Sequence, residues 1–239
     1  MDETGGLLVL TAIREERRAI VNALAAAHAE ARSGAQGRVR VVETGDGSVR
    51  ASRGAREAID AFGPSHVLGA GVAGGLSAEL AAGDIVASAR VLDAAEEAPS
   101  PDPELLRRAL ALPGVRSGTV FSVLRPALTA SQKAALGVRA GATAVVDMES
   151  AAWARACGQA GVPYVFLRAI SDTAEEDLPG YLAGCMDAEG SIRRAAVASR
   201  ALLHPGSIPA LLRMRGRVAA AGRALGEAVA ALAASIPLA

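Results

Sequence analysis

Short apolar runs alternate with longer amphipathic stretches along most of the chain. Residues 7–11 and 162–170 are largely apolar, which is typical of buried strands, whereas residues 38–43 alternate between polar and apolar. Strands are predicted at residues 7–11, 38–43, 66–69, 82–88, 117–123, 144–146 and 162–170. Helices are predicted at about 17–29, 48–62, 103–110, 131–140 and 151–160, and over most of the remainder.

This alternation predicts an α/β fold, with a central mixed sheet flanked by helices. The chain shows no internal repeat and no linker long enough to separate two domains, so we expect a single domain. Residues 1–190 carry the alternating strands and helices. Residues 191–239 are expected to form a helical C-terminal extension of the same domain.

Composition and charge exclude several classes of protein. Of 239 residues, 51% are hydrophobic but only 3% aromatic, so the core must consist mainly of aliphatic side chains. The formal net charge is zero, which gives no reason to expect a nucleic-acid partner. Two cysteines and three scattered histidines lack the spacing of a metal site, so neither a metal nor a cofactor is expected. The apolar run at residues 7–10 is too short for a signal peptide, which predicts a cytoplasmic protein.

The C-terminal extension is unusually basic. Residues 190–239 contain seven arginines and one acidic residue, Glu227. Between residues 208 and 225, apolar side chains alternate with four of these arginines. One interpretation is a solvated helix packed on the domain. The other is weak peripheral contact of residues 205–230 with an anionic membrane.

Polar residues and glycines follow nearly every predicted strand. They occupy residues 14–16, 45–47, 71–75, 125–126, 147–149 and 171–172. Ligands of open α/β folds bind beyond the carboxyl ends of strands, so this pattern predicts one site assembled from many loops. The glycine segment 69–75 is no dinucleotide fingerprint, because a strand and not a helix follows it. A tight turn is as good an interpretation of that segment as a ligand loop.

Four segments carry a resemblance to a known superfamily. Residues 71–76 with 83–86, residues 146–152 (V-D-M-E-S-A-A), residues 168–172 (R-A-I-S-D) and residues 12–16 resemble segments of methylthioadenosine/adenosylhomocysteine nucleosidases. Their order and spacing agree over about residues 7–175. On this resemblance the chain is identified as a member of the nucleoside phosphorylase/nucleosidase superfamily, which implies cleavage of a purine–ribose bond.

Other features resemble the hopanoid-associated phosphorylase-like subfamily. Asp147 replaces the usual glutamate of the V-E-M-E motif, and Pro126 stands where nucleosidases carry an aromatic residue. The tail at residues 205–211 reads P-G-S-I-P-A-L, as in that subfamily. The resemblance implies release of adenine from a lipid-linked adenosyl hopanoid.

The resemblance also implies roles for individual residues. Asp172 would protonate the leaving purine, Glu16 would orient the attacking water, and Glu149 would bind ribose hydroxyls. Further substrate contacts are expected from Met148, Asp147, Ser171, Pro126, Ala127, Gly71, Val72, Ala73 and Gly74. A site for water or phosphate is expected at Gly45, Asp46, Gly47 and Arg125. From residue types alone, a helix N-cap is the simpler interpretation of Asp172, and Glu15 is the alternative to Glu16 if the match slips by one position.

The sequence leaves alternatives open. Val72 stands where relatives often place a serine, which removes one phosphate donor, so water is favoured over phosphate as the nucleophile. A soluble nucleoside could be the substrate, as for purine nucleoside phosphorylases and methylthioadenosine/adenosylhomocysteine nucleosidases. A non-catalytic nucleoside-binding protein would use the same fold. We also expect a homo-oligomer, with a dimer as the first expectation.

Overall fold

A computed structural model describes residues 5–31, 39–187, 189, 191–204, 206 and 208–238. The elements in chain order are β1 (Leu7–Thr11), α1 (Arg14–Ala31), β2 (Val39–Glu43), α2 (Ser48–Phe62), β3 (His66–Gly75), β4 (Ile85–Leu92), α3 (Pro103–Leu110), β5 (Val115–Ser122), α4 (Ala130–Ala140), β6 (Ala144–Asp147), α5 (Ser150–Ala160), β7 (Tyr164–Asp172), η1 (Gly180–Cys185), α6 (Arg194–Leu203) and α7 (Ile208–Ser235). The predicted strand start at Arg38 and the domain boundary at Gly190 lie outside the described residues, as do Pro205 and Ser207 of the tail motif.

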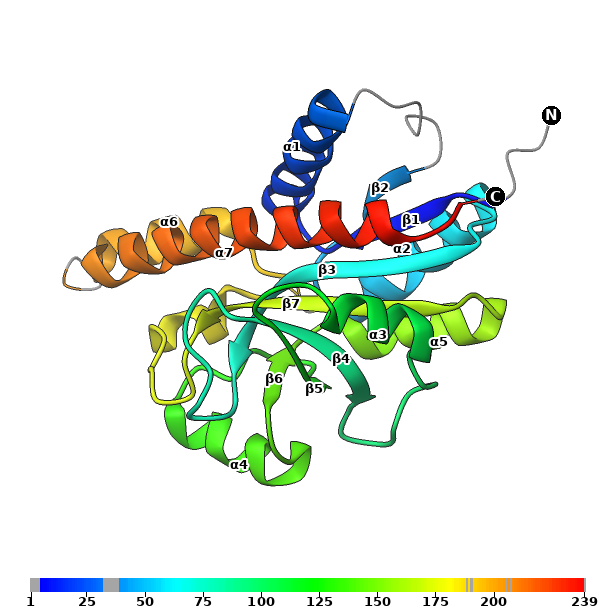
Figure 1. Ribbon diagram of the computed structural model, residues 1–239. Helices are drawn as coiled ribbons and strands as arrows, with labels where there is room; N and C mark the ends of the chain where they lie inside the picture. Colours follow the sequence, from blue (N-terminus) through cyan, green and yellow to red (C-terminus); the bar gives the residue numbers. More distant parts are fainter. Residues whose placement is uncertain are drawn as a thin grey trace.

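The seven strands form one mixed sheet that closes on itself (Figure 1). Their order is β2-β1-β3-β6-β5-β4-β7, and β7 also pairs with β3. Strands β3, β6, β5, β4 and β7 therefore make a closed ring, and β1 and β2 extend the sheet from β3. The β3–β6 and β4–β7 pairs are antiparallel and the others are parallel, which confirms the predicted mixed sheet.

Helices cover both faces of the sheet because the strands are apolar on both. In β1, Leu7 and Val9 face the core shared with α1 and α7, whereas Leu8 and Leu10 face the core shared with α2 and α5. Successive side chains of a strand point to opposite faces. The unbroken apolar run at the start of the chain is thus explained by burial on both sides.

The glycine segment lies within strand β3, so the tight-turn interpretation, one of the two left open by the sequence, is wrong. A Cβ at Gly69 would stand 2.9 Å from the Trp153 ring and would clash with Phe166. A Cβ at Gly71 would clash with the Arg168 guanidinium and lie 2.9 Å from a Glu16 oxygen. The glycines let large side chains cross the strand at close range.

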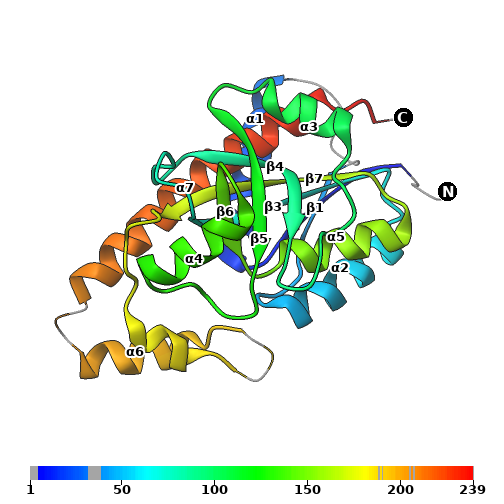
Figure 2. The same ribbon diagram turned by 90° about the horizontal axis from the view of Figure 1, so that it is seen from below.

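The C-terminal extension is divided between the core and the surface. Ala221, Leu225, Val229 and Leu232 of α7 are buried against the body of the domain. Helix α6 and the first half of α7 extend beyond the sheet (Figures 1 and 2). Among the described residues, one stretch, Leu211–Ser235, is long and apolar enough to cross a membrane, but half of its apolar window is buried in the protein. That burial is typical of a core helix.

Candidate active site

A cavity of about 230 Å³ lies beside the last part of β3, near the ends of β1, β6 and β7. The β1–α1 turn, the β6–α5 turn and the end of β7 contribute to its wall. Its lining residues are Ala12, Ile13, Glu16, Asp46, Val72, Ala73, Gly74, Val123, Pro126, Ala127, Val146, Asp147, Met148, Glu149, Ser171, Asp172, Leu178 and Ile192. The structure thus brings together residues from all six strand exits singled out in the sequence.

Four of the expected site residues lie outside this lining. Gly71 is buried behind the wall, beside Glu16 and Arg168. Gly45 and Gly47 form the turn before α2, where both have positive φ, and the Gly47 N–H donates to Glu149 Oε1 at 2.8 Å. Arg125 is exposed and contributes no charge to the cavity wall.

Glu16 is a buried carboxylate held by backbone donors. Its Oε2 accepts from the N–H groups of Ala12 and Ile13 at 3.0 and 3.2 Å, and its Oε1 accepts from the Val72 N–H at 2.9 Å. Burial raises the pKa of Glu16, while these hydrogen bonds and the Arg168 charge oppose the rise. Glu15 is exposed, so the structure places Glu16 and not its neighbour at the cavity.

Glu149 is a second buried acid, and its environment disfavours the charged form. It is the residue before α5 and is 7% exposed. Burial, together with the nearby Asp147 carboxylate, raises the pKa of Glu149 to about 8, against the opposing effect of Arg168. Met148 lies between these two acids in sequence and lines the cavity.

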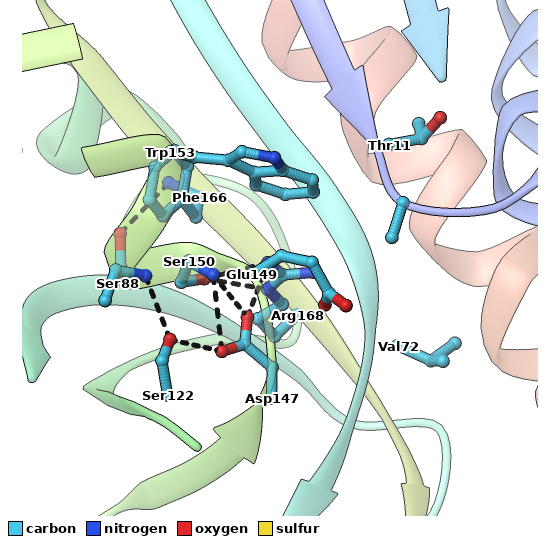
Figure 3. Close-up of polar contacts among 12 residues, drawn as sticks. Thr11, Val72, Ser88, Ser122, Asp147, Glu149, Ser150, Trp153, Phe166 and Arg168 are labelled. Carbon is cyan, nitrogen blue, oxygen red and sulfur yellow. Dashed lines mark hydrogen bonds and ion pairs between the residues drawn. The ribbon is translucent and has the colours of Figure 1, made fainter. Parts of the chain in front are cut away.

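Arg168 is the centre of this acidic group, and the sequence predictions did not assign it to the site. It is fully buried in β7, with its guanidinium 4.7 Å from the Trp153 ring centroid (Figure 3). Nη2 pairs with Asp147 Oδ2 at 2.5 Å and donates to Ser150 Oγ at 2.8 Å. Among the described residues, Nη1 is a buried side-chain donor without a hydrogen-bond partner. An arginine inside an otherwise apolar strand was the available clue in the sequence.

Asp172 ends β7 and carries a partner that the sequence did not suggest. Lys133 Nζ lies 2.5 Å from Asp172 Oδ2, and the Ser171 hydroxyl donates to Oδ1 at 2.6 Å. The two partners give Asp172 a polar surrounding although it is 6% exposed. No helix begins after Asp172 until η1 at Gly180, so the N-cap interpretation is wrong.

A second cavity adjoins the first. It has a volume of about 500 Å³ and shares Val123 and Met148 with the smaller cavity. Phe121, Leu124 and Leu136 give it an apolar wall. In the part of the chain that the structure describes, no group of His, Cys, Asp or Glu side chains is arranged to hold a metal ion.

Comparison with known proteins agrees with this geometry. The family described as the Phosphorylase superfamily matches residues 29–205. The 5′-methylthioadenosine/S-adenosylhomocysteine nucleosidase of Shewanella halifaxensis is 32% identical over 165 residues, covering 59% of this chain and 71% of that protein. The nucleosidase of the same name from Chromohalobacter salexigens is 29% identical over 169 residues, covering 59% and 70%.

Solved structures share the fold over almost the whole chain. The Helicobacter pylori 5′-methylthioadenosine/S-adenosylhomocysteine nucleosidase with butyl-thio-DADMe-Immucillin-A superposes with a TM-score of 0.73 at 17% identity, covering 98% of this chain and 100% of that one. The futalosine hydrolase of H. pylori strain 26695 gives 0.72 at 17% identity, covering 98% and 99%.

The family match and the nucleosidase relatives identify an enzyme that cleaves N-glycosidic bonds, and the acidic cavity in its closed mixed sheet is the candidate active site. The chain belongs to the Phosphorylase superfamily.

Proposed function

We propose that this enzyme hydrolyses the N-ribosyl bond of an adenine nucleoside and does not use phosphate. The observation that carries this proposal is the position of Glu16. Its carboxylate occupies the backbone N–H groups of Ala12, Ile13 and Val72 at the cavity wall. Backbone N–H groups are the donors that a bound phosphate needs, and here a negative charge already fills them.

The charges around the cavity also oppose phosphate. Three buried acids, Glu16, Asp147 and Glu149, surround the single guanidinium of Arg168. Arg50, another candidate donor, is paired with Asp187 and Glu189 at 2.7 Å each. The buried cations Arg168 and Lys133 are likewise paired with Asp147 and Asp172, at 2.5 Å each. A phosphate dianion would therefore lack a free positive charge, which a neutral water molecule does not need.

Different residues act on the purine side and on the ribose side of the scissile bond. Asp172 protonates the purine as the bond between N9 and the ribose carbon breaks, and the bonding electron pair leaves with the base. Glu16 orients water toward the ribose carbon and accepts its proton. Glu149 binds ribose hydroxyls, and Met148 packs on the sugar.

The choice between water and phosphate gives a direct prediction. In phosphate-free buffer the enzyme is expected to release adenine at its full rate, and the sugar product should carry a free anomeric hydroxyl. Base release can be followed by chromatography at increasing phosphate, with mass analysis of the sugar. A strict requirement for phosphate, with a sugar 1-phosphate as product, would contradict the hydrolytic proposal.

For the non-purine half of the substrate we propose a bulky apolar group, as in a lipid-linked adenosyl hopanoid. The second cavity supports this choice because it is larger than the first, shares Val123 and Met148 with it and has an apolar wall of Phe121, Leu124 and Leu136, although Asp93, Arg139 and Arg155 also line it. Burying hydrocarbon there would stabilise binding by about 25 cal/mol per Å² of apolar surface. A panel of adenosylhopane, 5′-methylthioadenosine and inosine tests this assignment by comparing kcat/KM.

A soluble nucleoside is the second candidate, because the relatives that match this chain are named as 5′-methylthioadenosine/S-adenosylhomocysteine nucleosidases. A higher kcat/KM for 5′-methylthioadenosine than for adenosylhopane would favour it. We further propose a homo-oligomer, with the dimer as the first expectation, which light scattering would measure.

A membrane-derived substrate leads us to propose peripheral membrane contact through the projecting helices. Leu202 and Leu203, at the end of α6, are 77% and 76% exposed, and Leu212, in the first turns of α7, is 62% exposed. Arg213 and Arg215 follow Leu212 in α7 and are exposed as well. Each basic residue near an anionic leaflet contributes about 1 kcal/mol, so the contact should be weak and sensitive to salt.

Liposome co-sedimentation tests this contact. The protein is expected to pellet with anionic vesicles at low salt, and not at high salt or with neutral vesicles. Leu202→Ser combined with Leu212→Ser should weaken pelleting, whereas Val138→Ser, at another exposed apolar residue, should not. Point variants are preferable to truncation, because the second half of α7 belongs to the core. Full-length protein that stays in the supernatant at low salt would contradict the proposal.

A further inference from the structure

Lys133 is a buried cation whose position is unusual for its residue type. It is the only lysine of the chain, and all other basic residues apart from histidine are arginine. Helix α4 carries it at 0% exposure, with Nζ 2.5 Å from Asp172 Oδ2. Lysine is almost never fully buried without a charged partner, and here that partner is the proposed acid of the reaction.

Hydrogen bonds fix the position of the Lys133 ammonium group and the directions of its three N–H donors. Nζ donates to the carbonyl oxygens of Thr173 and Glu176 at 2.7 and 2.8 Å, and the third donor faces Asp172. An ammonium has three donors in a tetrahedral arrangement, so the two carbonyls and the carboxylate use all of them. A planar guanidinium would not match these three acceptors.

The helix that carries Lys133 is itself joined to the segment after β7. The Ala130 N–H donates to Asp177 Oδ1 at 2.7 Å, and the Leu178 N–H donates to the Leu128 carbonyl at 2.7 Å. Leu178 also lines the cavity. The start of α4 and residues 172–178 therefore hold one another in place, and Lys133 is the charged contact between them.

We propose that Lys133 is a positioning residue for Asp172 that acts on departure of the purine. This inference rests on the hydrolytic function proposed above. Asp172 must carry a proton in the substrate complex; when it gives that proton to the base, it returns to the carboxylate of this ion pair, at a position that is 6% exposed. The Lys133 ammonium, which keeps its own three protons, stabilises that carboxylate and holds it at the base end of the cavity.

A purely structural role is a poor explanation for this ion pair. Removing two charges from water costs several kcal/mol per ion, and apolar side chains of similar volume often stabilise a fold as well or better. A methionine could fill the volume beside β7, but it could not respond to the charge that develops on Asp172.

A double-mutant cycle between Lys133 and Asp172 tests this inference. Lys133→Met alone is expected to lower kcat for the best nucleoside of the panel roughly 10²-fold, the lower end of the contribution of general acid catalysis. Asp172→Asn alone should lower kcat at least as much. The double variant should be no slower than Asp172→Asn, because Lys133 then has no carboxylate to act on. It also avoids an unpaired buried charge, so it remains measurable if a single variant folds poorly.

A substrate with a different leaving group separates a catalytic effect from a structural one. p-Nitrophenyl β-D-ribofuranoside releases a stable anion that needs no proton, so Lys133→Met should retain its kcat within about threefold of the wild type. Arg107→Met, which removes an exposed cation from α3, is the matched control and should leave both activities unchanged.

The outcomes separate this inference from the proposed function. Equal losses on both substrates, or a further loss when Lys133→Met is added to Asp172→Asn, would show that Lys133 is structural. An unchanged kcat for Lys133→Met on the nucleoside would also overturn the role. Wild-type enzyme that releases no adenine from any nucleoside of the panel would instead refute the proposed function.

Discussion

Replacing Asp172 by asparagine is expected to slow adenine release roughly 10²- to 10⁴-fold, the usual contribution of general acid catalysis. An amide cannot protonate the leaving base, although it occupies nearly the same volume beside Ser171. The measurement is kcat for the best nucleoside of the panel. A thermal melt should accompany it, because the change leaves Lys133 buried without its carboxylate partner.

A matched control for this variant is Asp60→Asn, which makes the same chemical change at an exposed position of α2. It is expected to leave kcat and the melting temperature unchanged. An Asp172→Asn enzyme that folds and retains kcat within about threefold of the wild type would remove Asp172 from the role of proton donor.

The stability of the folded enzyme is expected to fall as the pH rises from about 5 to about 8. Burial raises the pKa of Glu149 from its ordinary value of 4.5 to about 8. Between these two values the folded protein retains a proton that the unfolded chain has lost. The free energy of unfolding therefore decreases with rising pH across this window. Glu16 contributes in the same direction, because burial raises its pKa as well.

Replacing Glu149 by glutamine should reduce this pH dependence and make the protein more stable than the wild type at pH 8, by on the order of 2 kcal/mol. Urea unfolding at pH 5, 6, 7 and 8 measures the effect for both proteins. Glu57→Gln, at an exposed position of α2, should follow the wild-type curve. If Glu149→Gln is less stable than the wild type at pH 8, the carboxylate is not the destabilising group that its burial indicates.

Much of the architecture follows from local patterns that the sequence displays. The apolar runs of β1 and β7 and the amphipathic periods of α2 and α3 depend on which residues are buried, and burial leaves a direct mark on hydrophobicity. Helices α2 and α3 were placed at their observed bounds, and the mixed sheet followed from the alternation of elements. Closure of the sheet through the β3–β7 pair was not predictable, because strand pairing depends on contacts distant in sequence.

The candidate site likewise combines residues that the sequence identified with residues whose roles only the structure explained. Glu16, Glu149 and Asp172 were found because each stands at a strand exit within a recognisable segment, and the structure brings all three to one cavity. For the glycine segment the sequence left a tight turn and a ligand loop open, because the small size of Gly69 and Gly71 serves Trp153, Phe166 and Arg168, which belong to other elements. A sequence pattern does not show which distant side chain packs against a glycine in the folded protein.

The sequence by itself determined the order of strands and helices, the superfamily and the acids at the strand exits, since these are written in short segments. Only the tertiary structure decided the electrostatics of the site. Arg168 lies in β7 and Lys133 in α4. Each forms an ion pair with a carboxylate that only folding brings near: Asp147 for Arg168 and Asp172 for Lys133. The tertiary structure also divided the basic C-terminal extension into a core half and a projecting half, because burial depends on what packs against a helix as well as on its composition.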